Sequence, residues 1–147
     1  PYLKSPVLLL AMLLFGVYSF AQKKNAAYNI HIQKTEETFT IDGKGDEATW
    51  QQAEPADDFF MVLPMDDRKA TQPSEVKMAY DDKHLYLLAT FFKTPGNTYV
   101  VESLRRDFSF GGNDNFLLFM DPFNNQTTGF SFGANAYGAQ CDGTMSR

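Results

Sequence analysis

The chain has 147 residues, with 13 Lys and Arg against 18 Asp and Glu, and a formal net charge of −5. This balance leaves no basic surplus to neutralise a phosphate backbone, so we expect no nucleic-acid partner. Hydrophobic residues make up 44% and aromatic residues 15% of the chain, which excludes a disordered composition and predicts a packed core. Cys141 is the single cysteine, so it has no disulfide partner within the chain and is expected in the core.

The first 21 residues have the three parts of a secretory signal peptide. Lys4 supplies the positive start, residues 7–17 form an uncharged apolar run, and Ser19 and Ala21 are the small residues that signal peptidase reads. A membrane anchor needs about 20 apolar residues, more than this run provides. We therefore expect residues 1–21 to be a cleaved signal peptide. The protein would be exported to the periplasm, the outer membrane or the extracellular space.

Beyond the leader, apolar residues recur mostly with a period of two, between clusters of Gly, Pro, Asn and Asp. This pattern is typical of antiparallel strands. It predicts strands at residues 29–34, 38–41, 58–62, 75–80, 84–92, 115–120 and 129–135. Residues 81–83 have the length of a hairpin loop between two of these strands.

One short helix interrupts the strands at residues 46–53. Asp46 is suited to cap its N-terminus, Pro55 ends it, and Trp50 is expected to pack beneath the sheet. Since long crossover helices are absent from the pattern, an α/β fold is excluded. The sequence therefore predicts an all-β protein, an antiparallel β-sandwich of two sheets, immunoglobulin-like or jelly-roll-like, with one short helix. Residues 22–147 would form this domain as a fragment of a longer protein.

A motif runs from Ile41 to Trp50 in the order hydrophobic, Asp, Gly, two variable residues, Asp, Glu, two variable residues, Trp. It is followed by a Tyr-Asp-Asp turn at residues 80–82, by Arg-Arg-Asp at 105–107 and by Asp-Asn-Phe at 114–116. In order and spacing these segments resemble a family 9-type carbohydrate-binding module, as found at the N-terminus of large exported Bacteroidetes-type proteins. The resemblance covers almost the whole chain after the leader and implies a glycan-binding β-sandwich.

The candidate ligand-binding residues lie in loops and combine charge with aromatic faces. They are Arg105, Arg106, Asp107, Asp114, Tyr99 and Tyr137. Arg presents a planar fork of donors and Asp a pair of acceptors, which match vicinal sugar hydroxyls, and Tyr can stack on a pyranose. The well-understood sugar-binding modules clamp a sugar between two Trp, whereas Trp50 is the single Trp here. An alternative for Arg105, Arg106, Asp107 and Asp114 is an ion-pair network that ties loop to sheet.

Calcium is the expected cofactor, because the loops carry hard oxygen donors of the kind that Ca²⁺ binds. The candidate metal ligands are Asp81, Asp82, Asp114 and Asp121. The resemblance also implies calcium, which family 9-type modules carry.

We expect a non-catalytic carbohydrate-binding module of an exported protein. Its partners would be a glycan or oligosaccharide and a downstream domain of the same chain, with glycan breakdown carried out there by a hydrolase of O-glycosyl bonds. Asp107 and Asp114 are the pair that would serve hydrolysis within the chain, which needs carboxylates about 5–10 Å apart. One alternative is a structural or assembly domain that caps a downstream β-barrel-like region and binds no sugar. Another is a haem-binding sandwich, for which the candidates are Met61, Met65, Met78 and Met120.

Overall fold

A computed structural model describes residues 28–65 and 67–146. All helices and strands below belong to the unit Ile32–Arg147, which is described by itself. The predicted signal peptide, residues 1–21, lies outside the described residues. Within the part that the structure describes, no helix has the length and apolar character needed to cross a membrane.

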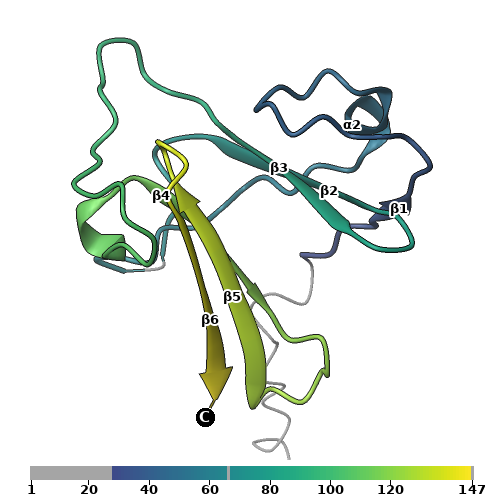
Figure 1. The fold of residues 1–147 in the computed structure, drawn as a ribbon. Coiled ribbons are helices and arrows are strands. Elements are labelled where there is room, and N and C mark those ends of the chain that lie inside the picture. The colour runs from purple at the N-terminus through teal and green to yellow at the C-terminus, as the bar shows by residue number, and fades with distance from the viewer. Residues whose placement is uncertain (1–27, 66, 147) are drawn as a thin grey trace, which may run out of the picture. The chain divides into compact units, whose positions relative to one another are not determined.

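The described chain is mostly β, as predicted, and contains one α-helix and two sheets of three strands each (Figure 1). The first sheet has the order β1 (Gln33–Lys34), β2 (Ser74–Tyr80), β3 (Leu85–Phe91). The second has the order β4 (Asn115–Met120), β5 (Thr128–Asn135), β6 (Gln140–Ser146). The helix α2 spans Ala48–Gln52, and a single 3₁₀ turn, η1 (Phe110–Gly112), precedes β4.

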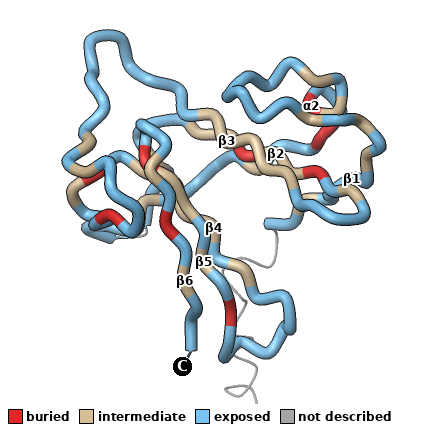
Figure 2. Tube along the Cα trace, in the orientation of Figure 1, coloured by how far each residue is buried: buried red, intermediate tan, exposed pale blue. Residues whose placement is uncertain are grey.

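Trp50 is the centre of the core on the first sheet. Its side chain is 5% exposed and clusters with Ala53 and with the fully buried Ala79 of β2. The ring of Phe39 lies 4.9 Å from Trp50 and 4.2 Å from Tyr86, measured between centroids. The expected packing of the indole against the sheet is therefore confirmed, and Figure 2 shows buried positions at α2 and β2.

The predicted hairpin between β2 and β3 is confirmed, with Tyr80 paired to Leu85 across the antiparallel ladder. Asp81 organises its loop. The carboxylate of Asp81 accepts hydrogen bonds from the amides of Lys83 and His84, both at 2.6 Å, and from the hydroxyl of Tyr86 at 2.8 Å. The bond from the Lys83 amide is the main reason why the pKa of Asp81 lies far below its usual range.

Two of the predicted strands are wrong, and a third is much shorter than expected. Residues 38–41 do not form a strand, because Phe39 packs against Trp50 on a segment without a ladder partner. Residues 58–62 contribute only an isolated bridge between Phe60 and Lys69. Of residues 29–34, only β1 is a strand, and it pairs parallel to β2 rather than antiparallel.

The strand β6 was not predicted. Asp142 and Gly143 lie in its middle, and both residue types are depleted in strands, so its sequence gives a weak signal. Burial nevertheless alternates over its first five residues, with Cys141 buried at 7% exposure beside Gly133 of β5. Burial raises the pKa of the Cys141 thiol. The expected core position of this cysteine is confirmed.

The helix α2 is shorter than predicted, and its capping differs. The N-cap residue is Glu47 rather than Asp46, and it makes no side-chain capping bond. The carboxylate of Glu37 instead accepts hydrogen bonds from the amides of Ala48 and Thr49, at 3.2 and 2.8 Å. A residue from the preceding segment thus satisfies donors that the first turn of a helix leaves free. The sequence pattern favoured Asp46 because Asp is a common N-cap residue.

The second sheet carries apolar side chains on both faces. Its register pairs Leu118 with Phe132 and Leu117 with Gly133, and paired positions share a face while adjacent positions alternate. Phe132 is 47% exposed on one face, and Phe119 is 59% exposed on the other. A Cβ atom on Gly133 would lie 2.5 Å from the carbonyl oxygen of Phe116, so the lack of a side chain permits this close packing.

Candidate functional site

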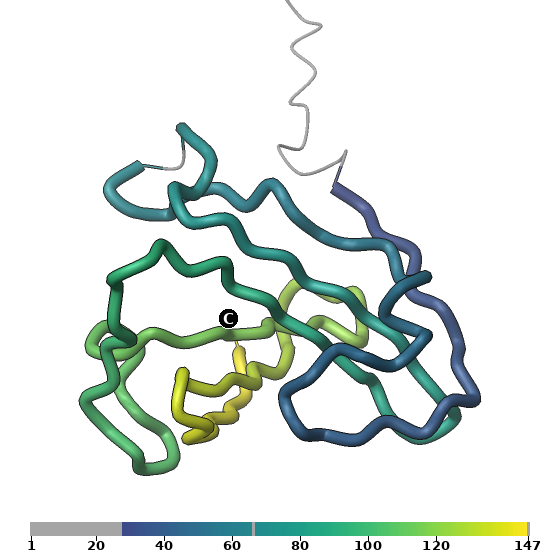
Figure 3. Tube along the Cα trace, turned by 90° about the horizontal axis from the view of Figure 1, so that it is seen from above, coloured from purple at the N-terminus to yellow at the C-terminus, as the bar shows by residue number. Residues whose placement is uncertain are grey.

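Two buried asparagines fix the long segment that joins the sheets, residues 92–109, which Figure 3 shows between β3 and η1. Asn113 is 8% exposed, and its Oδ1 accepts hydrogen bonds from the amides of Glu102 and Ser103, at 2.9 and 3.2 Å. Its Nδ2 donates to the carbonyl of Ser109 at 2.7 Å. The side chain therefore satisfies three backbone groups that no sheet ladder reaches.

Asn135, at the end of β5, anchors the same segment from the other side. It is 5% exposed, and its Nδ2 donates to the carbonyl of Ser103 at 2.7 Å. Its Oδ1 accepts hydrogen bonds from the amides of Tyr137 and Ala139, at 3.1 and 3.0 Å, in the turn to β6. Sequence reasoning missed both asparagines as organising residues. The sequence does place each Asn near or at the end of a predicted strand. Asn is common in the turns found at such positions.

A cavity of about 720 Å³ lies where these elements meet, and we call it the Tyr99 cleft. The end of β3, residues 92–93 and 96–99, the start of β4 and residues 134–136 line it, together with Gln72. Phe91 and Phe116 form an aromatic floor, with ring centroids 6.0 Å apart. Tyr99 is 47% exposed, and Asn97 and Thr98 add amide and hydroxyl groups to the lining.

Asp114 lines the cleft and is hydrogen-bonded to the neighbouring residues Val100 and Ala136. Its amide donates to the carbonyl of Val100 at 2.7 Å, and its Oδ2 accepts from the amide of Val100 at 2.9 Å. Its carbonyl accepts from the amide of Ala136 at 2.9 Å. The second carboxylate oxygen, Oδ1, has no hydrogen bond to any described residue, so it remains available as an acceptor.

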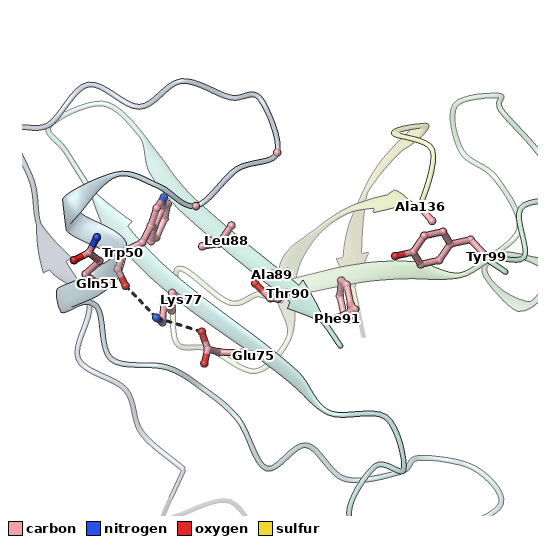
Figure 4. A pocket seen from close by; sticks show the side chains of 12 residues that line it. Trp50, Gln51, Glu75, Lys77, Leu88, Ala89, Thr90, Phe91, Tyr99 and Ala136 are labelled. Atoms are coloured by element: carbon pink, nitrogen blue, oxygen red, sulfur yellow. Dashed lines mark hydrogen bonds and ion pairs between the residues drawn. The ribbon is translucent and has the colours of Figure 1, made fainter. Parts of the chain in front are cut away.

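A second cavity, of about 740 Å³, runs from Trp50 along the first sheet towards Tyr99, and we call it the Trp50 groove (Figure 4). Lys77 is the positively charged residue that lines this groove. The Nζ atom of Lys77 donates to the carbonyl of Trp50 at 3.0 Å and pairs with Glu75 at 3.2 Å. The ammonium group of Lys77 is therefore already engaged by two groups of the groove itself.

The structure brings together only part of the predicted ligand set. Tyr99 and Asp114 line the cleft, whereas Arg105, Arg106, Asp107 and Tyr137 are not among its lining residues. Arg106 forms an ion pair with Asp142 of β6. The amide of Asp107 donates to the carbonyl of Gln140 at 2.9 Å from a left-handed backbone conformation, φ +58°. These contacts connect the loop to β6.

The other two predicted residues lie near the same loop and turn. The side chain of Tyr137 is 66% exposed in the β5–β6 turn, next to the lining residue Ala136. The amide of Arg105 donates to Ser103 Oγ at 3.2 Å. The predicted residues therefore divide between the cleft, the loop that contacts β6 and the β5–β6 turn.

The four predicted calcium ligands do not form one cluster. The carboxylate of Asp81 accepts hydrogen bonds from its own hairpin, and Asp82 forms an ion pair with Lys34 at 2.5 Å. Asp121 accepts hydrogen bonds from backbone amides of the β4–β5 turn, and the bond from the Gln126 amide is the main cause of its lowered pKa. The described residues contain no group of three or more His, Cys, Asp or Glu side chains that could hold a metal ion.

Each cavity is lined by one carboxylate residue among the described residues, Asp114 in the Tyr99 cleft and Glu75 in the Trp50 groove. An aromatic floor with amide, hydroxyl and single charged groups is an arrangement that can hold a small polar ligand. No family model matches the chain, and no curated protein or solved structure is significantly similar to it.

Proposed function

We propose that the chain is a carbohydrate-binding module of an exported protein and that the Tyr99 cleft is its sugar site. The observation that carries this proposal is the placement of the half-exposed Tyr99 ring beside Asn97, Thr98 and the free Oδ1 of Asp114. A sugar presents an apolar CH face and a rim of hydroxyls. Tyr can stack on the first, and amide, hydroxyl and carboxylate groups can bind the second.

The proposal includes the finer features expected from the sequence. Residues 1–21 are removed on export, and the two sheets belong to a β-sandwich. Support for the sandwich comes from a contact between the sheets, since the rings of Phe91 in β3 and Phe116 in β4 lie 6.0 Å apart, measured between centroids. Glycan breakdown is carried out downstream, so this domain contributes affinity and not chemistry.

Affinity is expected to be modest. Each sugar hydroxyl exchanges a hydrogen bond to water for one to protein, with a small net gain. A single Tyr also buries less apolar area than a pair of Trp. We expect micromolar or weaker dissociation constants, about −8 kcal/mol or less favourable.

Calorimetry of the full chain against a panel of soluble oligosaccharides tests the proposal. Tyr99→Ala is expected to lower affinity about tenfold, or about 1.4 kcal/mol. Phe123→Ala is the matched control, because Phe123 is 64% exposed and does not line the cleft. The affinity of Tyr137→Ala shows whether the β5–β6 turn is part of the sugar site. Absence of binding to every glycan, with the variants correctly folded, would overturn the proposal.

A structural or assembly domain is the second candidate, and one observation favours it. The second sheet exposes Phe119 and Met145 on one face and Phe130 and Phe132 on the other. Contiguous exposed apolar groups of this kind mark interaction surfaces. If no glycan binds and Phe132→Thr abolishes a self-association seen by light scattering, this function replaces the first.

A further inference from the structure

We infer that the Tyr99 cleft selects glycans that carry a carboxylate, with Lys93 as the group that recognises the charge. The inference rests on the proposed function and names its substrate class. It starts from the position of Lys93, which lines the cleft with Tyr99. The Nζ atom of Lys93 lies over the Tyr99 ring, 4.4 Å from its centroid.

The Nζ atom of Lys93 covers one face of the Tyr99 ring. A cation over an aromatic ring is held by the ring quadrupole, and the attraction is about 0.5–1 kcal/mol at an exposed site. A neutral ligand that stacks on this face must displace the ammonium group without compensation. A ligand with its own negative charge draws the ammonium group to itself, so the same step becomes favourable.

The charge distribution supports this reading, because most described Lys and Arg residues outside the cleft have carboxylate partners. The ion pairs are Lys34–Asp82, Lys44–Asp42, Arg68–Asp67, Lys69–Asp58, Lys77–Glu75 and Arg106–Asp142. Lys93 has no carboxylate partner among the described residues. Lys83 and Arg105 share this property but do not line the cleft. In a chain of net charge −5, the cleft therefore holds a lysine that is free to pair with an anion.

Asp114 is the opposing charge in the cleft, and it sets the orientation of the ligand. One of its oxygens is occupied by the Val100 amide, and the other is free to accept. A uronosyl residue carries both a carboxylate and vicinal hydroxyls. Its carboxylate would pair with Lys93 and its hydroxyls would donate to Asp114, so the two protein charges bind opposite ends of one sugar.

The test compares oligogalacturonate with its fully methyl-esterified form of the same length, using calorimetry on the full chain. The two ligands differ in charge and little in shape. We expect the acid form to bind about tenfold more tightly at low salt, or about 1.4 kcal/mol. This preference should shrink as salt is raised, because exposed charge pairs are screened.

Lys93→Met keeps the apolar stem and removes the charge, so it should abolish the preference while binding of the ester persists. Lys83→Met removes an unpaired lysine outside the cleft and should leave the preference intact. Equal binding of the two ligands by the unmodified chain, or an undiminished preference in Lys93→Met, would overturn the inference and leave the proposed function standing. Failure of both ligands and of every neutral glycan would overturn both.

Discussion

The two sheets are held in different ways. Around β1, β2 and β3 the chain buries apolar groups, with Trp50 against Ala79 and the ring of Phe39 stacked on Tyr86. Around β4, β5 and β6, buried amides hold the loops, with Asn113 and Asn135 each satisfying three backbone groups. Apolar burial is non-directional, whereas a hydrogen bond depends on the distance and angle between donor and acceptor. The Tyr99 cleft lies beside the loops that the buried asparagines hold.

The largest effect is expected from Trp50→Ala, which removes the centre of the apolar region. Truncating a buried Trp typically costs about 3–5 kcal/mol of unfolding free energy. Urea denaturation followed by circular dichroism measures this loss. Phe123→Ala, at an exposed aromatic, is the control and should change little. If Trp50→Ala lowers the unfolding free energy no more than the control does, apolar burial around Trp50 is not what holds the first sheet.

Gly133→Ala should be the most damaging small change in the second sheet. Its Cβ would lie 2.5 Å from a backbone oxygen of β4 and 3.0 Å from Cys141 Sγ, so backbone must move. Overpacking of this kind costs about 1–3 kcal/mol. Gly111→Ala is the matched control, since nothing lies within 4 Å of the added atom. Equal melting temperatures for the two variants would contradict the close approach between β4 and β5.

Asn135→Ala tests the polar support itself. It leaves the Ser103 carbonyl and the Tyr137 and Ala139 amides without their partner, and an unsatisfied buried group costs about 1–3 kcal/mol. Asn135→Asp retains an acceptor for the two amides and should lose less. Hydrogen exchange at residues 137 and 139 should rise in the Ala variant. Unchanged exchange would show that the turn holds without the side chain.

The smallest effect is expected from pH at the β2–β3 hairpin. Hydrogen bonds from Lys83, Tyr86 and His84 lower the pKa of Asp81 in the folded chain, so ionised Asp81 stabilises the fold above its unfolded pKa of about 3.9. That contribution is lost as pH falls through the folded-state pKa. Asp81→Asn should flatten the fall in unfolding free energy below about pH 4. An equally steep fall in the variant would assign the acid sensitivity to other carboxylates.

Much of the strand pattern could be predicted because alternation is local. The β2–β3 hairpin, β4, β5 and the burial of Trp50 all follow from spacing and turn residues. The strand β6 could not, since its backbone pairing is decided by β5 and not by its own residues. The cap from Glu37, and the loop contacts of Asn113 and Asn135, join positions far apart in the chain. A single sequence carries no signal for such pairs.

The parallel pairing of β1 with β2 has a consequence for the order of folding. It joins Gln33 to Ala79 across the whole segment that contains α2, whereas β2–β3 and β5–β6 are closed by short turns. Closing a long loop costs more chain entropy than closing a short one. During synthesis from the N-terminus, the residues of β1 must therefore wait, unpaired, until β2 has been made. We expect β1 to dock last on this sheet, onto a hairpin that is already formed.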